Sequence, residues 1–388
     1  MRNRRRLCGW GLLTCAVVTV MGRSVHAQLA VVAGDNKLVL VDGVQTVVRN
    51  PQADTVTLID IGASPPRVLG TVHAPNSVIG PPQNVAVAAG GAIALVASST
   101  KIDPADATRT IPDDVVSVID ITAAPPKVIA TLHAGRGASG VSISPDGHLA
   151  LVANRMAGTI SVFAVEGATV TPAGTVDLGA PESGPSHVTF TRDGRRALVT
   201  RNNDSLISVL SIAGRTVTYT KRDLVAGVKP YGIEVAAAGD AAVVAHIGAG
   251  AAGGVDTLAV IDLSSEPERV VDQVAAGPIV EGLAISADGR YVAATVMDGS
   301  NLAKTSPLFH DTGRLRVFQL RDRRLTPVAE APTGHWCQGA AWSRDGRRIV
   351  VECMADRNLR VYAFDGRSLT SSAPLPIEGG PAGIRVAP

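Results

Sequence analysis

The stretch GVSISPDGHLALVANRMAGTISVFAVEGATVTPAGTVDLG, residues 140–179, contains four short apolar segments separated by turn residues. Residues 141–144 and 149–154 flank Asp146-Gly147, and residues 159–165 and 169–178 follow. Asp-Gly between two apolar runs is a strong hairpin signal, because both residue types tolerate positive φ. The stretch therefore predicts a four-stranded antiparallel sheet of about forty residues.

Variants of this unit recur along almost the whole chain. An inner hairpin is expected to begin near each of seven positions, at intervals of 45 to 57 residues: Lys37, Asn84, Gly140, His187, Gly232, Gly282 and Gly339. A turn follows each start, from Asp42-Gly43 in the first to Asp345-Gly346 in the last, and an outer hairpin follows each turn. Repeats of this period whose sheets cannot bury their own faces are typical of β-propellers. The sequence predicts an all-β, seven-bladed propeller of four-stranded antiparallel blades in a single domain, residues 28–388.

Two strands are left over, residues 29–33 and 383–387. Pairing them in one blade would close the ring and remove exposed sheet edges. Whether the C-terminal strand replaces residues 37–41 as innermost strand stays open from the sequence.

Two blades carry insertions between their second and third strands, residues 99–113 and 297–313. These insertions should rise from the rim that also carries the links into the innermost strands, and long loops often carry function.

The first 27 residues read as a secretory signal peptide. Four arginines within residues 2–6 precede an apolar stretch, and Val25-His26-Ala27 fits a small-x-small cleavage pattern. Removing five arginines with this segment changes the net charge from +2 to −3. A mildly acidic chain with 3% aromatic residues has no footprint for nucleic acid, and no later segment could span a bilayer as a helix. We expect a monomer, periplasmic or secreted after cleavage near Ala27.

Two cysteines remain after that cleavage, Cys337 and Cys353, with the turn Asp345-Gly346 midway between them. Folding this hairpin places them nearly opposite each other on antiparallel strands, which suits a disulfide in an oxidising compartment. The alternative is two buried thiols one register step apart. Two cysteines without paired histidines nearby do not fill a zinc site, so no metal and no cofactor are expected.

The segments SPDGHLALVANRMAGTISV, SADGRYVAATV and SRDGRRIVVECMADRNLRVYAF resemble the YVTN (YncE-like) seven-bladed propeller family, which lies close to the lactonase-type propellers. The resemblance covers essentially the whole mature chain. It implies an exported protein that binds a partner or ligand more than it implies an enzyme.

Residues just before the innermost strands should surround the mouth of the central channel. Convergent polar groups at a concave mouth are a usual ligand-site hypothesis, although they also simply solvate a channel. The candidates at this mouth are Gln83, Asn84, Ser139, Ser186, His187, Tyr231, Glu281 and Gln338. Loops between second and third strands add Arg155, Arg201, Asn202 and Asp298 on the same rim, where they could contact an anionic ligand or solvate the loops.

His187 and Glu281 are the pair with acid–base capacity in this set, two blades apart. The run from Pro185 to Phe190 resembles a Pro-x-His-x-x-Phe run of the lactonase-type propellers, with Ser186 where that family tends to have arginine. No nucleophile elbow, P-loop or dinucleotide fingerprint is present in the sequence. Two functions follow: an exported, non-catalytic propeller that binds a protein partner or small ligand at this rim, or a lactonase that uses His187 and Glu281.

Overall fold

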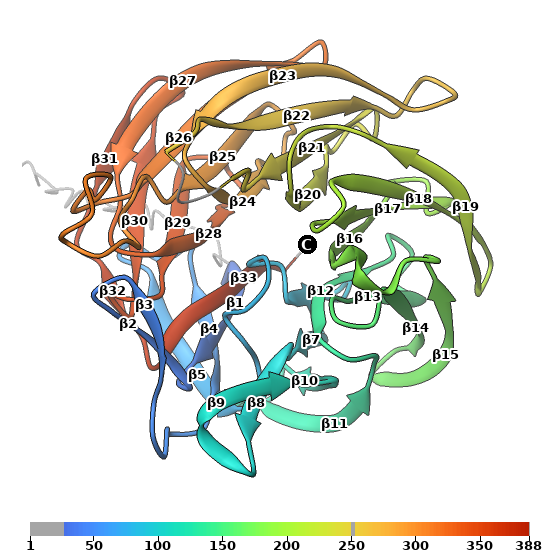
Figure 1. Ribbon diagram of the computed structural model, residues 1–388, viewed down its shortest axis with the longest axis horizontal. Coiled ribbons are helices and arrows are strands. Elements are labelled where there is room, and N and C mark those ends of the chain that lie inside the picture. The colour runs from blue at the N-terminus through green and yellow to red at the C-terminus, as the bar shows by residue number, and fades with distance from the viewer. Residues whose placement is uncertain (1–26, 250–252, 388) are drawn as a thin grey trace, which may run out of the picture.

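The computed structural model describes residues 27–249 and 253–387. Seven sheets of four or five antiparallel strands surround a central channel, which makes the molecule a seven-bladed, all-β propeller (Figure 1). The predicted fold class is thereby confirmed. The predicted leader lies outside the described residues except for Ala27. Within the described ranges, no helix has the length and apolar character that a bilayer crossing requires.

The blades, numbered 1 to 7 in chain order, each run outward from an innermost strand at the channel. Blade 1 contains β33 (Gly380–Val386), β1 (Leu29–Asp35), β4 (Thr55–Asp60) and β5 (Arg67–His73); blade 2 contains β6 (Val85–Val87), β7 (Ile93–Ala97), β10 (Val115–Asp120) and β11 (Lys127–His133); and blade 3 contains β12 (Ala138–Ile143), β13 (Leu149–Asn154), β14 (Thr159–Glu166) and β15 (Thr169–Asp177). Blade 4 contains β16 (Pro185–Phe190), β17 (Arg196–Arg201), β18 (Leu206–Ala213) and β19 (Thr216–Leu224), and blade 5 contains β20 (Pro230–Val235), β21 (Ala241–His246), β22 (Asp256–Asp262) and β23 (Arg269–Gly277). Blade 6 contains β24 (Val280–Ile285), β25 (Tyr291–Val296), β26 (Arg314–Arg321) and β27 (Arg324–Pro332), and blade 7 contains β28 (Cys337–Trp342), β29 (Arg348–Cys353), β30 (Asn358–Phe364), β31 (Leu369–Ser371) and the short β32 (Leu375–Pro376). Two further hairpins, β2 (Leu38–Val41) with β3 (Val44–Val47) and β8 (Thr100–Asp103) with β9 (Asp106–Pro112), and one short 3₁₀ helix, η1 (Pro181–Ser183), lie outside the blades.

Burial decreases from the channel side of each blade to its outer edge. Every residue of the second strand β13 is buried, whereas the fourth strand β11 alternates between exposed and half-buried residues. The apolar side chains of neighbouring blades pack together in seven separate clusters, one for each of the seven blade interfaces. No blade can bury its two faces alone, so closure of the ring supplies the core.

Four of the Asp-Gly turns, at Asp146, Asp193, Asp288 and Asp345, are held by a hydroxyl group two residues earlier. The Ser144 hydroxyl donates to Asp146 Oδ1 at 2.5 Å, and the His148 amide donates to the same oxygen at 3.1 Å. These two bonds hold the pKa of the Asp146 carboxyl below its ordinary value. Only the glycine takes positive φ, 76° at Gly147, whereas Asp146 does not. The turn aspartates are therefore structural, as the turn chemistry predicts.

Replacing Gly147 by alanine is expected to destabilise the protein by about 1 kcal/mol, the cost of positive φ for a residue with a Cβ. The added Cβ would meet only Ala89 Cβ at 3.9 Å, so backbone strain acts alone. Urea unfolding at pH 7 measures the effect. Gly254→Ala is the matched control, because Gly254 has open space around it and no positive φ. Equal midpoints for the two variants would contradict this account of the turn.

The chain ends close the ring in blade 1, where the C-terminal strand β33 is innermost and pairs with β1, Ala30 opposite Val386. The prediction of an inner hairpin near Lys37 with its turn at Asp42-Gly43 is wrong. Those residues form the separate hairpin β2–β3, in which Val41, Val44, Gln45 and Thr46 are exposed. The β2–β3 hairpin, of which half the residues are exposed, cannot fill an innermost position, whereas β33 is mostly buried.

Three insertions therefore lie between second and third strands, on the rim that carries the links into the innermost strands. The hairpins β2–β3 and β8–β9 and the loop of residues 297–313 extend along one side of this rim (Figure 1). The Lys304 amide donates to Asp42 Oδ1 at 3.0 Å, which ties the loop to the first hairpin. Leu38 and Met297 share a buried cluster with Trp336. The insertions thus form a continuous wall, and we call the channel end on this side the upper mouth.

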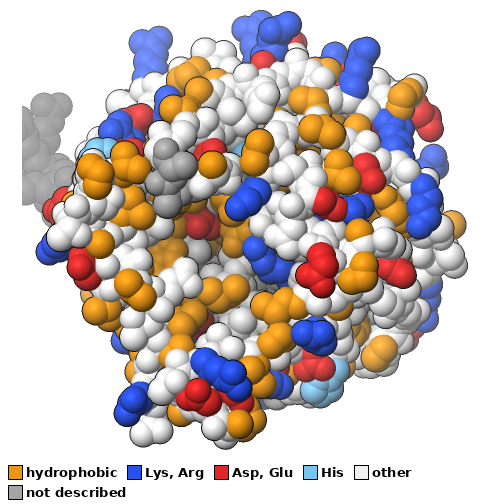
Figure 2. All heavy atoms as spheres, viewed as in Figure 1, with side chains coloured by type: hydrophobic (Ala, Val, Ile, Leu, Met, Phe, Trp, Pro, Cys, Tyr) orange, Lys and Arg blue, Asp and Glu red, His pale blue; other side chains and the backbone are white. Residues whose placement is uncertain are grey.

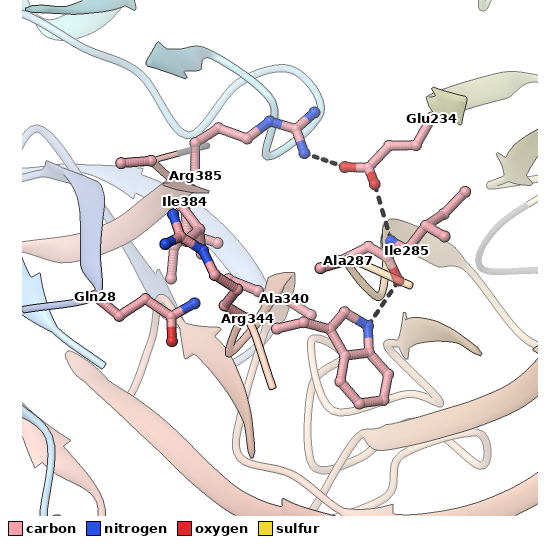
Figure 3. Close-up of a pocket in the computed structure, with 13 residues that line it drawn as sticks. Gln28, Glu234, Ile285, Ala287, Ala340, Arg344, Ile384 and Arg385 are labelled. Carbon is pink, nitrogen blue, oxygen red and sulfur yellow. Dashed lines mark hydrogen bonds and ion pairs between the residues drawn. The ribbon is translucent and has the colours of Figure 1, made fainter. Parts of the chain in front are cut away.

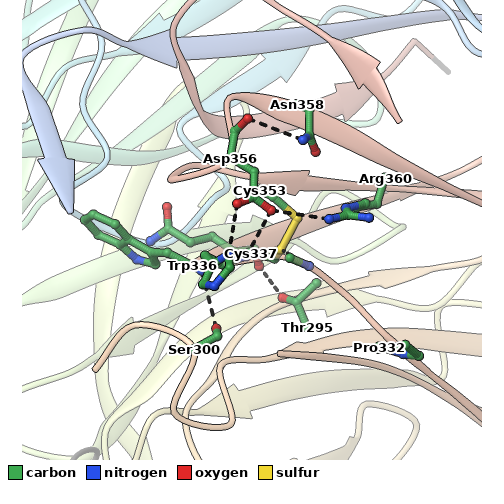
Figure 4. The surroundings of a disulfide bond; sticks show 12 residues. Thr295, Ser300, Pro332, Trp336, Cys337, Cys353, Asp356, Asn358 and Arg360 are labelled. Atoms are coloured by element: carbon green, nitrogen blue, oxygen red, sulfur yellow. Dashed lines mark hydrogen bonds and ion pairs between the residues drawn. A yellow bond between two sulfur atoms is a disulfide. The ribbon is translucent and has the colours of Figure 1, made fainter. Parts of the chain in front are cut away.

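A disulfide bond joins Cys337 on β28 to Cys353 on β29, with the two Cα atoms 3.8 Å apart (Figure 4). The two residues are direct partners in the register of this hairpin. The bond links the innermost strand of blade 7 to its second strand, next to Trp336 and the upper mouth. In this position it holds together the blade that packs against the ring closure.

Candidate functional site

The link between blades 1 and 2 crosses the channel at the upper mouth. An ideal Cβ at Gly282 would lie 2.7 Å from Pro82 Cγ, and one at Gly339 would lie 2.9 Å from Pro82 Cβ. A Cβ at Gly232 would lie 2.7 Å from Gln83 Nε2. Pro82 and Gln83 thus reach the innermost strands of blades 5, 6 and 7 from the opposite side of the ring. We call residues 78–84 the plug. Glycine is required at positions 232, 282 and 339, because a larger residue there would collide with the plug.

Six of the predicted site residues form one group beside the plug, which we call the Arg155 cluster. Its members are Arg155, Ser186, Asn202, Tyr231, Glu281 and Gln338. The Arg155 guanidinium donates to Ser186 Oγ at 2.6 Å and to Asn202 Oδ1 at 3.2 Å. It also lies over the Tyr231 ring, 5.4 Å from the ring centroid. In the described part of the chain Arg155 forms no ion pair with a carboxylate at salt-bridge distance, so its charge is available to an anion.

Glu281 supplies the acid–base group of the cluster. The residue is half-buried, but its Oε2 atom is buried and has no hydrogen-bond partner among the described residues. Burial raises the pKa of the Glu281 carboxyl to about 7, against the lowering effects of the Arg155 charge and of a hydrogen bond with Gln338. At neutral pH this carboxyl is therefore close to half ionised, which suits a general acid or base.

Tyr231 remains a hydrogen-bond donor in this setting. Burial raises the pKa of its hydroxyl well above the ordinary value, although the Arg155 charge lowers it in part. The nearby Gly80 amide of the plug also lowers this pKa. A neutral phenol next to a guanidinium group gives the cluster two donors that can stabilise negative charge on an oxygen atom.

His187 lies deeper, in the wall between the innermost strands, and is 1% exposed. Its Nδ1 accepts a hydrogen bond from the Ile233 amide at 3.3 Å, and its Nε2 has no partner among the described residues. Burial, and then the Arg385 charge, hold the pKa of the imidazole well below its ordinary value, so the ring is neutral. No described contact joins His187 to Glu281, because the His187 ring is buried in the wall and its Nδ1 is bonded to the Ile233 amide.

Glu352 is a buried acid that the sequence reasoning missed. It is fully buried on β29, and neither carboxylate oxygen has a hydrogen-bond partner within the described ranges. Burial raises the pKa of this carboxyl well above its ordinary value, opposed by the amides of Gly383 and Gly339 and by the Arg385 charge. In the matching position Thr200 of blade 4 connects the His187 amide to the Tyr231 carbonyl. A charged residue within the apolar run of β29 was the available sequence signal.

Three of the other predicted site residues, Asn84, Arg201 and Asp298, have structural partners. Asn84 donates to the Ser77 carbonyl at 3.2 Å, and Ser139 Oγ lies 2.3 Å from the ideal Cβ of Gly80 in the plug. Arg201 is paired with Asp204 and lies 3.5 Å from Asp223 at the outer side of blade 4. Asp298 pairs with Arg314 within the wall, at 2.5 Å. The structure thus separates these residues from the Arg155 cluster; Gln83 and Asn84 are part of the plug, and Ser139 lies against it.

The molecule is hollowed near the centre of the ring, and both acidic and basic side chains lie inside the hollow (Figure 2). Within the described segments, no group of three or more histidine, cysteine, aspartate or glutamate side chains is placed to hold a metal ion. The chemistry of the hollow therefore depends on the Arg155 cluster at the upper mouth and on two buried titratable residues below the plug, His187 and Glu352.

Comparison with known proteins points to lactonase-type propellers. A family model described as "Lactonase, 7-bladed beta-propeller" matches residues 114–233, less than half of the chain, and no curated protein matches. A Bacteroides fragilis protein provisionally named a 6-phosphogluconolactonase is 15% identical, with a TM-score of 0.71 over 95% of this chain and 100% of its own. The periplasmic gluconolactonase of Pseudomonas aeruginosa is 17% identical, with a TM-score of 0.66 over 94% of this chain and 99% of its own. These structures show that the chain shares the seven-bladed fold, and membership of the YVTN family stays a prediction.

Proposed function

We propose that this protein is a lactonase-type hydrolase that opens a small lactone at the Arg155 cluster. The observation that carries the proposal is the Glu281 carboxyl, whose pKa is raised to about 7 and whose Oε2 has no described partner, next to a guanidinium group without an ion pair. The partial match to the lactonase model and the names of the similar structures support it.

In the proposed reaction the ionised Glu281 carboxylate removes a proton from water as the water oxygen attacks the lactone carbonyl carbon. The carbonyl oxygen becomes negative and is stabilised by Arg155 and the Tyr231 hydroxyl. The ring C–O bond then breaks, the carbonyl re-forms, and the alkoxide takes the proton from Glu281. The product is an open hydroxy acid. Here Glu281 acts with Arg155, which replaces the predicted partnership with His187.

The test is hydrolysis of a panel of lactones, including glucono-δ-lactone and its 6-phosphate, corrected for spontaneous opening. Glu281→Gln is expected to lower kcat/KM at pH 8 by about 100-fold, because general base catalysis is worth that much or more. In the wild type kcat/KM should rise with pH and level off above about pH 7, as the carboxyl ionises.

Glu182→Gln, an exposed glutamate in η1, is the matched control and should retain full activity. No turnover of any lactone, or turnover that Glu281→Gln leaves unchanged, would contradict the hydrolase.

The second candidate function is the non-catalytic binder, which the unpaired Arg155 charge favours. Saturable binding of gluconate without turnover of the lactones, lost in Arg155→Met, would support that function. Export to the periplasm and a monomeric state belong to both candidates as proposals.

A further inference from the structure

The innermost strands end at the opposite side of the channel, which we call the lower mouth. Two adjoining cavities of about 220 Å³ and 420 Å³ open there, and both are lined by Glu234, Arg385 and Val386. Arg385 lies on β33 of blade 1, and Glu234 lies on β20 of blade 5. Their ion pair spans the channel (Figure 3), and both residues line both cavities.

Three of the four charged residues that line the two cavities are arginines: Arg192, Arg344 and Arg385, with Glu234 as the fourth. The Arg192 guanidinium donates to the carbonyls of Val235 and Ala236, at 3.0 and 3.2 Å, and forms no ion pair at salt-bridge distance within the described residues. The aspartates of the nearby turns, Asp193 and Asp345, do not line either cavity. Arginine side chains in a concave site favour an anion.

Unused hydrogen-bond donors point to the same conclusion. The Arg385 guanidinium has five N–H groups, and its described hydrogen bond is the one to Glu234. Gln28 Nε2 is buried at the edge of the smaller cavity without a described partner. Glu234 also accepts from the Ile285 amide at 2.9 Å, which fixes the carboxylate in place.

The remaining walls are compact and apolar. Ala284, Ala287 and Ala340 line the smaller cavity, next to Trp342, whose indole N–H is bonded to the Ala284 carbonyl at 3.0 Å. Ala86 and Phe190 line the larger one. Small side chains leave room beside the arginines, and the larger cavity is within the size range of small-molecule sites.

We propose that the lower mouth is a second ligand site, on the face opposite the Arg155 cluster, for a small organic anion with a carboxylate head and a short apolar body. The head group binds Arg385 in competition with Glu234, and the apolar body packs on the alanine walls. This inference is independent of the proposed hydrolase, because the two sites share no residue.

Isothermal titration calorimetry of the full chain with hexanoate tests the site, with acetate as the head group alone and inorganic phosphate as an alternative anion. Hexanoate should bind with a saturable 1:1 isotherm at least 10-fold more tightly than acetate or phosphate. Arg385→Met should weaken it at least 10-fold. Glu234→Gln should tighten it about 5-fold, because the glutamine keeps an acceptor for the Ile285 amide but releases the Arg385 charge.

Arg155→Met, at the upper mouth, is the control and should leave hexanoate affinity unchanged. Because Arg385→Met could disturb the ring closure, the opposite effect of Glu234→Gln keeps the test decisive. Weaker binding to Glu234→Gln, equal affinity for hexanoate and acetate, tighter binding of phosphate, or loss of binding in Arg155→Met would each overturn the proposal.

Discussion

Glu352→Gln is expected to make the protein markedly more stable at pH 8 and to flatten the dependence of its stability on pH. Glu352 is fully buried, and its carboxylate oxygens have no described hydrogen-bond partner. Its folded-state pKa is raised well above the ordinary value by burial. Glutamine has nearly the same shape and cannot ionise, so the variant removes the charge with little change in packing.

The sign of the effect follows from proton binding. Above the unfolded pKa of about 4.3 the unfolded chain releases the Glu352 proton, while the folded protein keeps it up to its raised pKa. The folded state then binds more protons, so the unfolding free energy falls as pH rises, by about 1.4 kcal/mol for each unit between the two pKa values. Glu281 contributes in the same direction up to about pH 7.

Urea unfolding of wild type and Glu352→Gln between pH 5 and pH 8 measures this difference. The two proteins should differ least at pH 5 and most at pH 8. Glu182→Gln, at an exposed position, should follow the wild-type curve. His187, whose pKa is held low by burial, acts in the opposite direction below about pH 6.5, so the difference between the two proteins is the measured quantity. A variant that keeps the full wild-type slope would contradict the raised pKa.

The second large effect is expected for Gly140→Ala, at the interface between blades 3 and 4. An ideal Cβ at Gly140 would lie 2.6 Å from His187 Cα and 2.6 Å from the Ser186 carbonyl oxygen. Both are backbone atoms, which cannot rotate away, so the innermost strands β12 and β16 would have to separate. Overpacking of this kind costs about 3 kcal/mol.

The free energy of urea unfolding at pH 7 gives the magnitude, again with Gly254→Ala as the neutral control. Because Ser186 carries the hydrogen bond to Arg155, the same variant should also weaken any ligand bound by the Arg155 cluster. A Gly140→Ala protein as stable as the control would show that the innermost strands are not in close contact.

The prediction of the fold depended on local patterns that tertiary contacts do not override. The segment around Asp146-Gly147 specifies its own hairpin, and its recurrence predicted the seven blades that the structure shows. The same pattern misled at Asp42-Gly43. There both turn residues have positive φ, 44° at Asp42 and 78° at Gly43, whereas in the blade turn at Asp146-Gly147 only the glycine does. A hairpin signal does not say whether its strands face the channel or lie outside the ring.

The candidate site was predicted in part. Arg155, Tyr231 and Glu281 were found because residues before innermost strands and residues after second strands meet on one rim of any propeller. Arg201 and Asp298 lie on the same rim, but oppositely charged neighbours hold them elsewhere, Asp204 and Asp223 for Arg201 and Arg314 for Asp298. Asp223 and Arg314 lie on other strands, so spacing along the chain could not separate these two residues from Arg155.

The sequence by itself determined the number and kind of blades, because turn chemistry and strand alternation act over a few residues and repeat. Only the tertiary structure decided that residues 78–84 close the upper mouth, that Glu352 lies beneath them, and that Arg385 crosses the lower mouth to Glu234. These contacts join residues far apart in the chain across a closed ring, and their electrostatics depend on burial that exists only when the ring is complete.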